Sequence, residues 1–298
     1  MKKWMKAAAW VLGILVLAAA AVAAAGWQMA GSKMARRIDV KPHPLALPTD
    51  TASLDRGRYL FASRGCVDCH GSGGEGRVFV DDGKGLRLKG PNISSGPGNV
   101  VARYTPADWE RTIRHGVKPD GTPAMIMPSE DYNRFTDQDL SALVAYARTL
   151  PPAEGTPAVL DLPPPVRILY GLGFIKDAAG KIDHALPPAQ PVAQGVTPEH
   201  GAYVANMCLG CHGAQLAGGR IPGGPPDWPA AANLTPGEGT AMTRYPDAQS
   251  LLAMFKSGKR PDGSDIKVMP FGSLRELNDI DVRALHLYLK SLKPLPQG

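Results

Sequence analysis

The sequence predicts a mainly α-helical protein with two similar domains in tandem, joined by a proline-rich linker and preceded by one transmembrane helix. Three observations predict this fold class: an uncharged run from Ala7 to Gly26, an internal repeat that relates the two halves of the chain, and helical apolar stripes that close both copies. The predicted segments are an N-terminal anchor with the start of a stalk at 1–35, a linker at 36–50, a first domain at 51–152, a proline-rich linker at 153–196 and a second domain at 197–298.

The N-terminal run has the length and the flanking residues of a membrane anchor. Three lysines precede the uncharged residues Ala7 to Gly26, and Trp4 and Trp27 bracket them as interfacial aromatic residues do. A cleaved signal peptide is the alternative, because Ala23-Ala24-Ala25 fits a small-residue cleavage site. The run is longer than an ordinary signal-peptide core, so we expect a single retained anchor in the cytoplasmic (inner) membrane, with the domains in the periplasm.

Charge and composition exclude nucleic-acid binding and point to a cofactor. The 33 Lys and Arg exceed the 27 Asp and Glu by six, but three of the lysines belong to the N-terminal lead. No basic block interleaved with aromatic residues occurs. Gly and Pro number 34 and 29, while aromatic residues make up only 6%. So few large side chains leave room for a flat apolar cofactor in the core.

The four cysteines form two C-x-x-C-H motifs, which are typical of covalent haem attachment. Two thiols three positions apart can each form a thioether with one haem vinyl group, and the following His supplies an axial imidazole. We therefore expect two covalently bound haem c groups. The expected thioether residues are Cys66, Cys69, Cys208 and Cys211, and the expected proximal iron ligands are His70 and His212.

Two other uses of C-x-x-C are less consistent with this chain. A thioredoxin-like redox pair requires a βαβ context, which the sequence lacks. Two C-x-x-C pairs can also build a four-thiolate zinc site. Here, however, the pairs lie in opposite halves of the chain, at 66–69 and 208–211, and the proline-rich linker separates them.

The repeat extends well beyond the cysteines. When Cys208 is placed on Cys66, the same offset aligns Gly71 with Gly213, Pro119-Asp120-Gly121 with Pro261-Asp262-Gly263, Met127-Pro128 with Met269-Pro270, and Tyr146 with Tyr288. Each copy is expected to be helical before its cysteines, at 54–63 in the first copy, where Tyr59 and Leu60 would face inward. Cap signals predict further helices from Thr105 to about His115 and after Thr136 and Asn278.

The second axial ligand of each iron is expected to be a methionine. Met127 and Met269 follow the first cysteine of their own motif at the same distance along the chain, and each precedes Pro. Methionine sulfur is a soft ligand that suits haem iron and raises its potential. Met125 and His115 are the alternatives in the first copy. The sequence gives no ligand role to His43, His184, His200 or His286, which are expected at the surface or in linkers, and Met207 is expected to pack near the haem.

The linker at 153–196 contains Pro163-Pro164-Pro165, Pro187-Pro188 and one apolar patch, Val166 to Ile175. We expect a semi-rigid spacer that packs against both domains. A docking surface for a partner subunit is the alternative.

These motifs resemble a known family. The residues concerned are Asn92-Ile93-Ser94, Pro119-Asp120-Gly121, Met127-Pro128 and Asp137-Gln138-Asp139-Leu140, together with their second-copy partners. With these motifs in two tandem class I cytochrome c domains, the chain resembles the cytochrome c subunits of membrane-bound bacterial alcohol, gluconate and aldehyde dehydrogenases. The resemblance covers about 51–152 and 197–298. It departs in one respect: the best-known of those subunits have three haem motifs, and this chain has two.

The resemblance implies electron transfer, with the catalytic site on a partner. A membrane-associated periplasmic dehydrogenase would be the donor, and quinone, another cytochrome or a terminal oxidase the acceptor. The residues suggest no catalytic group of their own, because the haem carries the redox chemistry. A di-haem peroxidase and a haem-based sensor are the alternatives. Both require an iron with an open position, whereas matched methionines in both copies predict closed irons.

Overall fold

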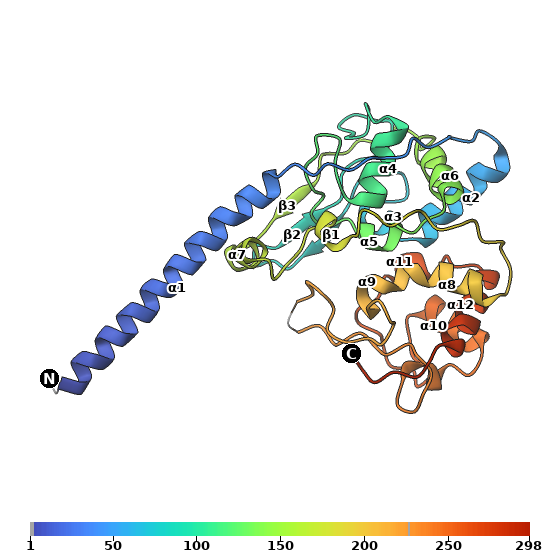
Figure 1. The fold of residues 1–298 in the computed structure, drawn as a ribbon. Helices are drawn as coiled ribbons and strands as arrows, with labels where there is room; N and C mark the ends of the chain where they lie inside the picture. Colours follow the sequence, from blue (N-terminus) through green and yellow to red (C-terminus); the bar gives the residue numbers. More distant parts are fainter. Residues whose placement is uncertain (1–2, 226) are drawn as a thin grey trace.

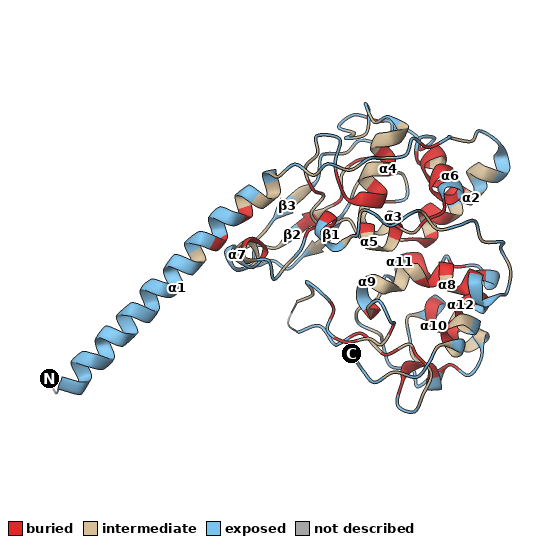
Figure 2. Ribbon diagram, viewed as in Figure 1, coloured by how far each residue is buried: buried red, intermediate tan, exposed pale blue. Residues whose placement is uncertain are grey.

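The computed structural model describes residues 3–225 and 227–298, and it is mainly helical, as predicted (Figure 1). The long helix α1 (Lys3–Ala35) projects from two helical halves that lie side by side. Along α1, only Gly26 and Ala30 are buried (Figure 2). Among the described residues, α1 is the one helix long and apolar enough to cross a membrane.

The two halves repeat the same order of helices. In the first half they are α2 (Thr51–Ser63), α3 (Cys66–His70), α4 (Pro106–His115), α5 (Ser129–Tyr132) and α6 (Asp137–Ala147). In the second half they are α8 (Pro198–Ala205), η2 (Asn206–Cys208) with α9 (Leu209–His212), α10 (Ala248–Ser257), α11 (Phe271–Leu274) and α12 (Asp279–Ser291), with η3 (Ala241–Arg244) added before α10. Thr105, Thr136 and Asn278 cap helices as predicted. Helix α2 begins at Thr51 rather than Leu54, because Asp50 caps it.

The first and last helices of each half cross at a glycine. A Cβ atom on Gly57 would lie 2.0 Å from the carbonyl oxygen of Ala142, and one on Gly201 would lie 2.0 Å from that of Ala284. Only glycine permits this approach of α2 to α6 and of α8 to α12. The crossing holds together the two ends of each half, between which the haem motif and the methionine loop lie.

The halves differ in what surrounds this frame. The first half carries an antiparallel sheet of β1 (Val78–Asp81), β2 (Arg87–Lys89) and β3 (Val159–Asp161), in that order. Strand β3 comes from the linker, which also forms α7 (Pro164–Leu172) and η1 (Ala179–Lys181). The sequence did not predict these elements. No strand is found in the described residues of the second half.

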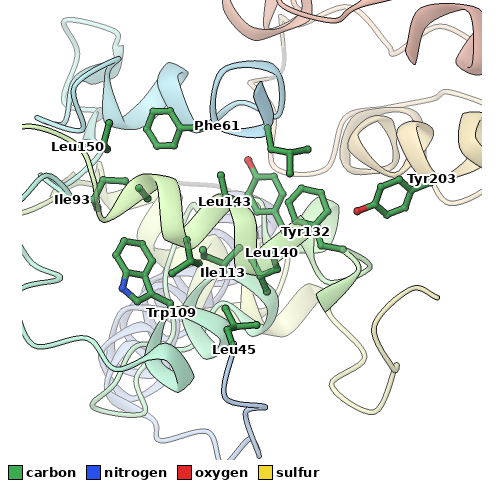
Figure 3. Close-up of a cluster of buried hydrophobic side chains, with 14 residues drawn as sticks. Leu45, Phe61, Ile93, Trp109, Ile113, Tyr132, Leu140, Leu143, Leu150 and Tyr203 are labelled. Atoms are coloured by element: carbon green, nitrogen blue, oxygen red, sulfur yellow. The ribbon is translucent and has the colours of Figure 1, made fainter. Parts of the chain in front are cut away.

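Each half has its own apolar core. The first-half core is drawn in Figure 3, and it includes one residue from the second half, Tyr203 of α8. The second core is formed by α8, α10 and α12 with residues of η3 and α11. Leu60 is completely buried, as predicted, whereas Tyr59 is only partly buried and its hydroxyl points to the second half.

Candidate functional site

The haem motifs form single turns that hold two thiols and an imidazole together. In the first half, Gly65 adopts a left-handed conformation (φ 87°) that lets the chain turn from α2 into α3. In the second half, α8 passes through η2 directly into α9. Gly71 and Gly213 end the two turns with φ values of 76° and 78°.

A backbone carbonyl orients each imidazole. The Nδ1 atom of His70 lies 3.0 Å from the carbonyl oxygen of Pro91, and that of His212 lies 2.7 Å from the carbonyl oxygen of Ala232. With Nδ1 as the donor, Nε2 carries the lone pair that a metal requires. Burial lowers the pKa of both histidines, although the carbonyl partly offsets it, so both rings are neutral and ready to ligate.

The repeated asparagine element is explained by this carbonyl. Asn92 follows Pro91, and its side chain donates to the carbonyl oxygens of Pro97 and Ala153, both at 2.9 Å. In the second half Asn233 follows Ala232 and donates to Leu295 at 2.7 Å. The asparagines therefore fix the segments that orient the histidines.

Burial keeps the thiols of Cys66, Cys69 and Cys208 protonated, whereas Cys211 is exposed. Burial raises the pKa of Cys66 and of Cys208 to about 12, and that of Cys69 to about 11. Cys66 packs against the first core and Cys208 against the second. Thiols that end as thioethers suit such an environment, because a thioether carries no charge.

Met127 and Met269 occupy equivalent loops. Each packs against the core of its own half, and each carbonyl accepts a hydrogen bond from the residue two positions on, at 2.8 Å from Ser129 and 2.9 Å from Phe271. The Pro-Asp-Gly turns that precede them are alike, since Gly121 and Gly263 both have φ 83°. The structure thus gives each half a thiol pair, a neutral imidazole and a thioether.

This donor set fits haem c and does not fit the alternative zinc site. Within residues 3–225 and 227–298, no group of three or more His, Cys, Asp or Glu side chains is arranged to hold a metal ion. The two cysteine pairs therefore do not converge on one four-thiolate site.

Two of the histidines are engaged elsewhere, and one expectation was wrong. His115 Nδ1 lies 3.1 Å from His184 Nδ1, so this alternative ligand faces the linker. The expectation of a surface or linker position for His200 is wrong, because His200 lies in α8 and is completely buried, with its Nε2 2.8 Å from Asp281. Met207 packs against the second core beside Cys208, and Met125 is not part of the first core.

Sequence reasoning missed the interface between the halves, which is built from repeat-related tyrosines. Tyr59 of α2 donates to Asp281 at 2.7 Å and accepts from the backbone N–H of Asn278 at 3.2 Å. Tyr203 of α8 donates to Asp139 at 2.8 Å and accepts from the N–H of Thr136 at 3.3 Å. Each tyrosine therefore binds the start of the other half's last helix. We call these the cross-domain tyrosine contacts.

A second repeat-related pair joins the haem motifs to the opposite half. The hydroxyl of Ser273 in α11 donates to Asp68 of the first motif at 2.7 Å. The N–H of Gly210 in the second motif donates to Asp131 of α5 at 3.0 Å. Helices α5 and α11 directly follow the Met-Pro pairs, so each haem motif contacts the segment beside the other half's methionine.

One signal for this interface was present in the sequence. Both tyrosines occur as Gly-x-Tyr, but Tyr59 stands farther from its haem motif than Tyr203 does, so the offset that aligns the cysteines does not align the tyrosines. An alignment that allows a short insertion before the first motif finds the pair.

Comparisons with known proteins agree with the duplicated site. Residues 52–146 match the family described as cytochrome c oxidase, cbb3-type, subunit III, and residues 199–293 match the family described as cytochrome c. The chain is 28% identical over 270 residues to the fructose dehydrogenase cytochrome subunit of Gluconobacter japonicus, covering 80% of the chain and 52% of that relative.

Two further relatives are similar over most of the chain. Identity is 28% to the cytochrome c subunit of the quinone-dependent alcohol dehydrogenase of Gluconacetobacter polyoxogenes, over 83% of the chain and 57% of the relative. It is 29% to a di-haem c-type cytochrome of Cereibacter sphaeroides, over 84% of the chain and 90% of the relative. The chain thus spans about half the length of the dehydrogenase subunits.

Proposed function

We propose that this chain, a di-haem class I cytochrome c with two covalently bound haem c groups, relays single electrons between a membrane-associated dehydrogenase and quinone, another cytochrome or a terminal oxidase. Electron transfer is its role, and catalysis belongs to a partner, as in the dehydrogenase cytochrome subunits that it resembles. The proposal places the haem domains in the periplasm, with α1 as the anchor in the cytoplasmic membrane.

The observation that carries the relay is the contact of each haem motif with the opposite half. Asp68 lies between Cys66 and Cys69 and accepts from Ser273, while Gly210 precedes Cys211 and donates to Asp131. Direct electron exchange is faster when the two centres are held close together. These contacts, with the cross-domain tyrosine contacts, favour direct exchange between the two haems rather than two independent carriers.

In this proposal the protein binds, orients and shields the haems. When bound, each haem would supply one-electron redox chemistry at its iron. Cys66, Cys69, Cys208 and Cys211 would hold the two groups, and His70 and His212 would ligate the irons, with Pro91 and Ala232 fixing their rings. Met127 and Met269 would supply the second ligand of each iron and raise the haem potentials. Closed irons favour a carrier over the peroxidase alternative.

Carbon monoxide binding to the full-length holoprotein in detergent tests the ligands. We expect two haems per chain and little CO binding to the reduced protein. Met127→Ala and Met269→Ala should each open one haem, so that about half of the haem binds CO. Met125→Ala is the matched control and should bind no more CO than the unaltered chain.

Two results would contradict these ligand assignments. Rapid CO binding to one haem of the unaltered protein would remove its methionine from the ligand set and support the peroxidase alternative. If Met125→Ala opened a haem and Met127→Ala did not, the first ligand would be Met125. Reduction of both haems in membranes that contain the donor dehydrogenase, after its substrate is added, would test the relay itself.

A further inference from the structure

The linker helix α7 packs on α1 from the end of the uncharged run, at Gly26, onward. Gly171 and Gly26 allow the two backbones to touch: a Cβ atom on Gly171 would lie 1.8 Å from the carbonyl oxygen of Gly26. Arg167 lies over the Trp27 ring, 4.1 Å from its centroid. Figure 1 shows α7 beside the part of α1 nearest the first half.

A polar cluster fixes the far end of this helix pair. Asp177, which follows α7, accepts from both Arg36 nitrogens at 2.5 and 2.8 Å and from the Tyr170 hydroxyl at 2.7 Å. Lys33 donates to the carbonyl oxygen of Tyr170 at 3.2 Å. The position of α7 along α1 is therefore set by glycine packing at one end and by buried charge at the other.

The remaining face of α7 is apolar and exposed. Leu169 is 41% exposed, and Phe174, just after the helix, is 77% exposed. On α1, Trp27 and Met29 are 42% and 44% exposed. Exposed large apolar side chains beside a membrane-spanning helix continue the apolar surface of that helix past the bilayer core.

The charge around this surface is mainly positive, although Asp39, Asp161 and Asp177 border the two segments and Asp177 pairs with Arg36. Residues 1–38 and 162–176 contain no Asp or Glu. The cations of the two segments that follow Gly26 are Lys33, Arg36, Arg37, Arg167 and Lys176. Cations beside an exposed apolar face match the phosphates of anionic lipids above their acyl chains.

We propose that α7 and Phe174 lie in the outer interface of the bilayer, so that the first half rests on the lipid surface and is not free on a stalk. This inference rests on the proposed anchoring by α1. The occupant of the exposed face is lipid: Leu169 and Phe174 contact acyl chains near the glycerol level, and Arg167 and Lys176 contact phosphates.

Photolabelling of the full-length holoprotein in vesicles of phosphatidylcholine and phosphatidylglycerol tests the proposal. The phospholipids carry a diazirine either near the glycerol or at the end of an acyl chain. Mass spectrometry should find label in α1 with both probes. We expect label in peptide 166–176 with the shallow probe only, and none in the peptide around Trp228, which is as exposed as Trp27 (both 42%).

A variant and its matched control assign the label to the apolar side chains. The double substitution Leu169→Ser with Phe174→Ser should lose the label of 166–176 and keep that of α1. Leu287→Ser in α12 changes a leucine that is 40% exposed and should keep both. Unchanged haem spectra would show that the variants fold.

Three results would contradict the proposal in distinguishable ways. Label in α1 without label in 166–176 overturns the lipid contact and leaves the anchor standing, as expected for a protein-docking surface. No label in either segment overturns the anchor itself. Label in 166–176 that persists in the double variant shows proximity without the proposed side-chain insertion.

Discussion

The two halves share the same order of helices, but the equivalent aspartates near the start of their last helices have different charged partners. Asp139 and Asp281 are equivalent residues at the third position of α6 and α12. Asp139 binds Arg56, which is 17% exposed, whereas Asp281 binds Arg64, which is 3% exposed and comes from the other half. Asp281 also binds His200, the counterpart of Arg56. The aspartates therefore occupy equivalent positions, but the ion pair of Asp139 lies within the first half and that of Asp281 joins the two halves.

A second difference between the halves is found in the two contacts that join each haem motif to the opposite half. Asp131 and Ser273 are equivalent, as are Asp68 and Gly210, so each contact pairs one carboxylate with one neutral donor. A carboxylate at all four positions would repel across the interface. In one contact the acceptor belongs to the haem motif and in the other it belongs to the helix after the Met-Pro pair.

The largest expected effect comes from Asp281→Asn. Removing this charge leaves Arg64 buried without a counter-ion, which costs about 3–5 kcal/mol of unfolding free energy. Asp139→Asn should cost less, because Arg56 can reach water. Denaturant unfolding of both holoproteins by circular dichroism measures the difference; equal losses would show that burial of the arginine partner is unimportant.

Much of the frame, but not this asymmetry, was predictable from sequence. Helix starts follow from local caps such as Thr105 with Asp108 and Thr136 with Asp139, while the ligand assignments stay predictions from motif spacing. Arg64 and Asp281 are 217 residues apart, and no local pattern signals such a pair. The sheet was missed because its strands have three or four residues, and one of them lies in the linker.

The Arg64–Asp281 ion pair should also make the unfolding free energy depend on pH in the acid range. Burial alone raises the pKa of Asp281, but the Arg64 charge outweighs it and holds the pKa at about 2, below the ordinary 3.8. The stabilisation is present above pH 4 and is lost as the pH falls through 2, and it amounts to about 2 kcal/mol at 1.36 kcal/mol per unit. Unfolding free energies measured from pH 6 to 2 should decline less steeply in Asp281→Asn.

The cross-domain tyrosine contacts should each contribute about 1.5–3 kcal/mol, as hydrogen bonds to a charged group do. We expect Tyr59→Phe and Tyr203→Phe to lower stability by similar amounts, since both hydroxyls bind one aspartate and one backbone N–H. Thermal unfolding followed by haem absorbance and by circular dichroism measures this. Tyr146→Phe is a control, since the Tyr146 hydroxyl makes no hydrogen bond within the described residues.

Asp131→Asn should stabilise the protein, unlike the preceding changes. Burial, with the neighbouring Glu130 charge, raises the pKa of Asp131 to about 8 from 3.8. A raised carboxyl pKa means that stability falls as the pH rises from about 4 to 8, because the unfolded chain ionises first. The asparagine keeps an acceptor for Gly210 without the charge, so we expect a gain of about 1–2 kcal/mol at pH 8. No gain at pH 8 would mean that the interface hydrates this carboxylate.

The smallest expected effect comes from replacing the helix caps Thr136 and Asn278, and it tests whether these caps contribute to the interface between the halves. Thr136 Oγ1 accepts from the N–H of Asp139 at 3.0 Å, and Asn278 Oδ1 accepts from that of Asp281 at 2.8 Å. Replacing a cap by Ala costs about 0.5–2 kcal/mol, and Asn is the stronger cap of the two. Thr105→Ala in α4 is the control, because its hydroxyl also accepts from the N–H three residues on, although Thr105 bonds in addition to the Asp108 carboxylate. The described contacts of α4 are to α5 and α6 of its own half. If Thr136→Ala and Asn278→Ala lower the unfolding free energy no more than Thr105→Ala does, the cross-domain tyrosine contacts do not depend on these caps. A larger cost in these two variants, removed by adding the matching Tyr→Phe change, would show that each cap positions an aspartate for the opposite half.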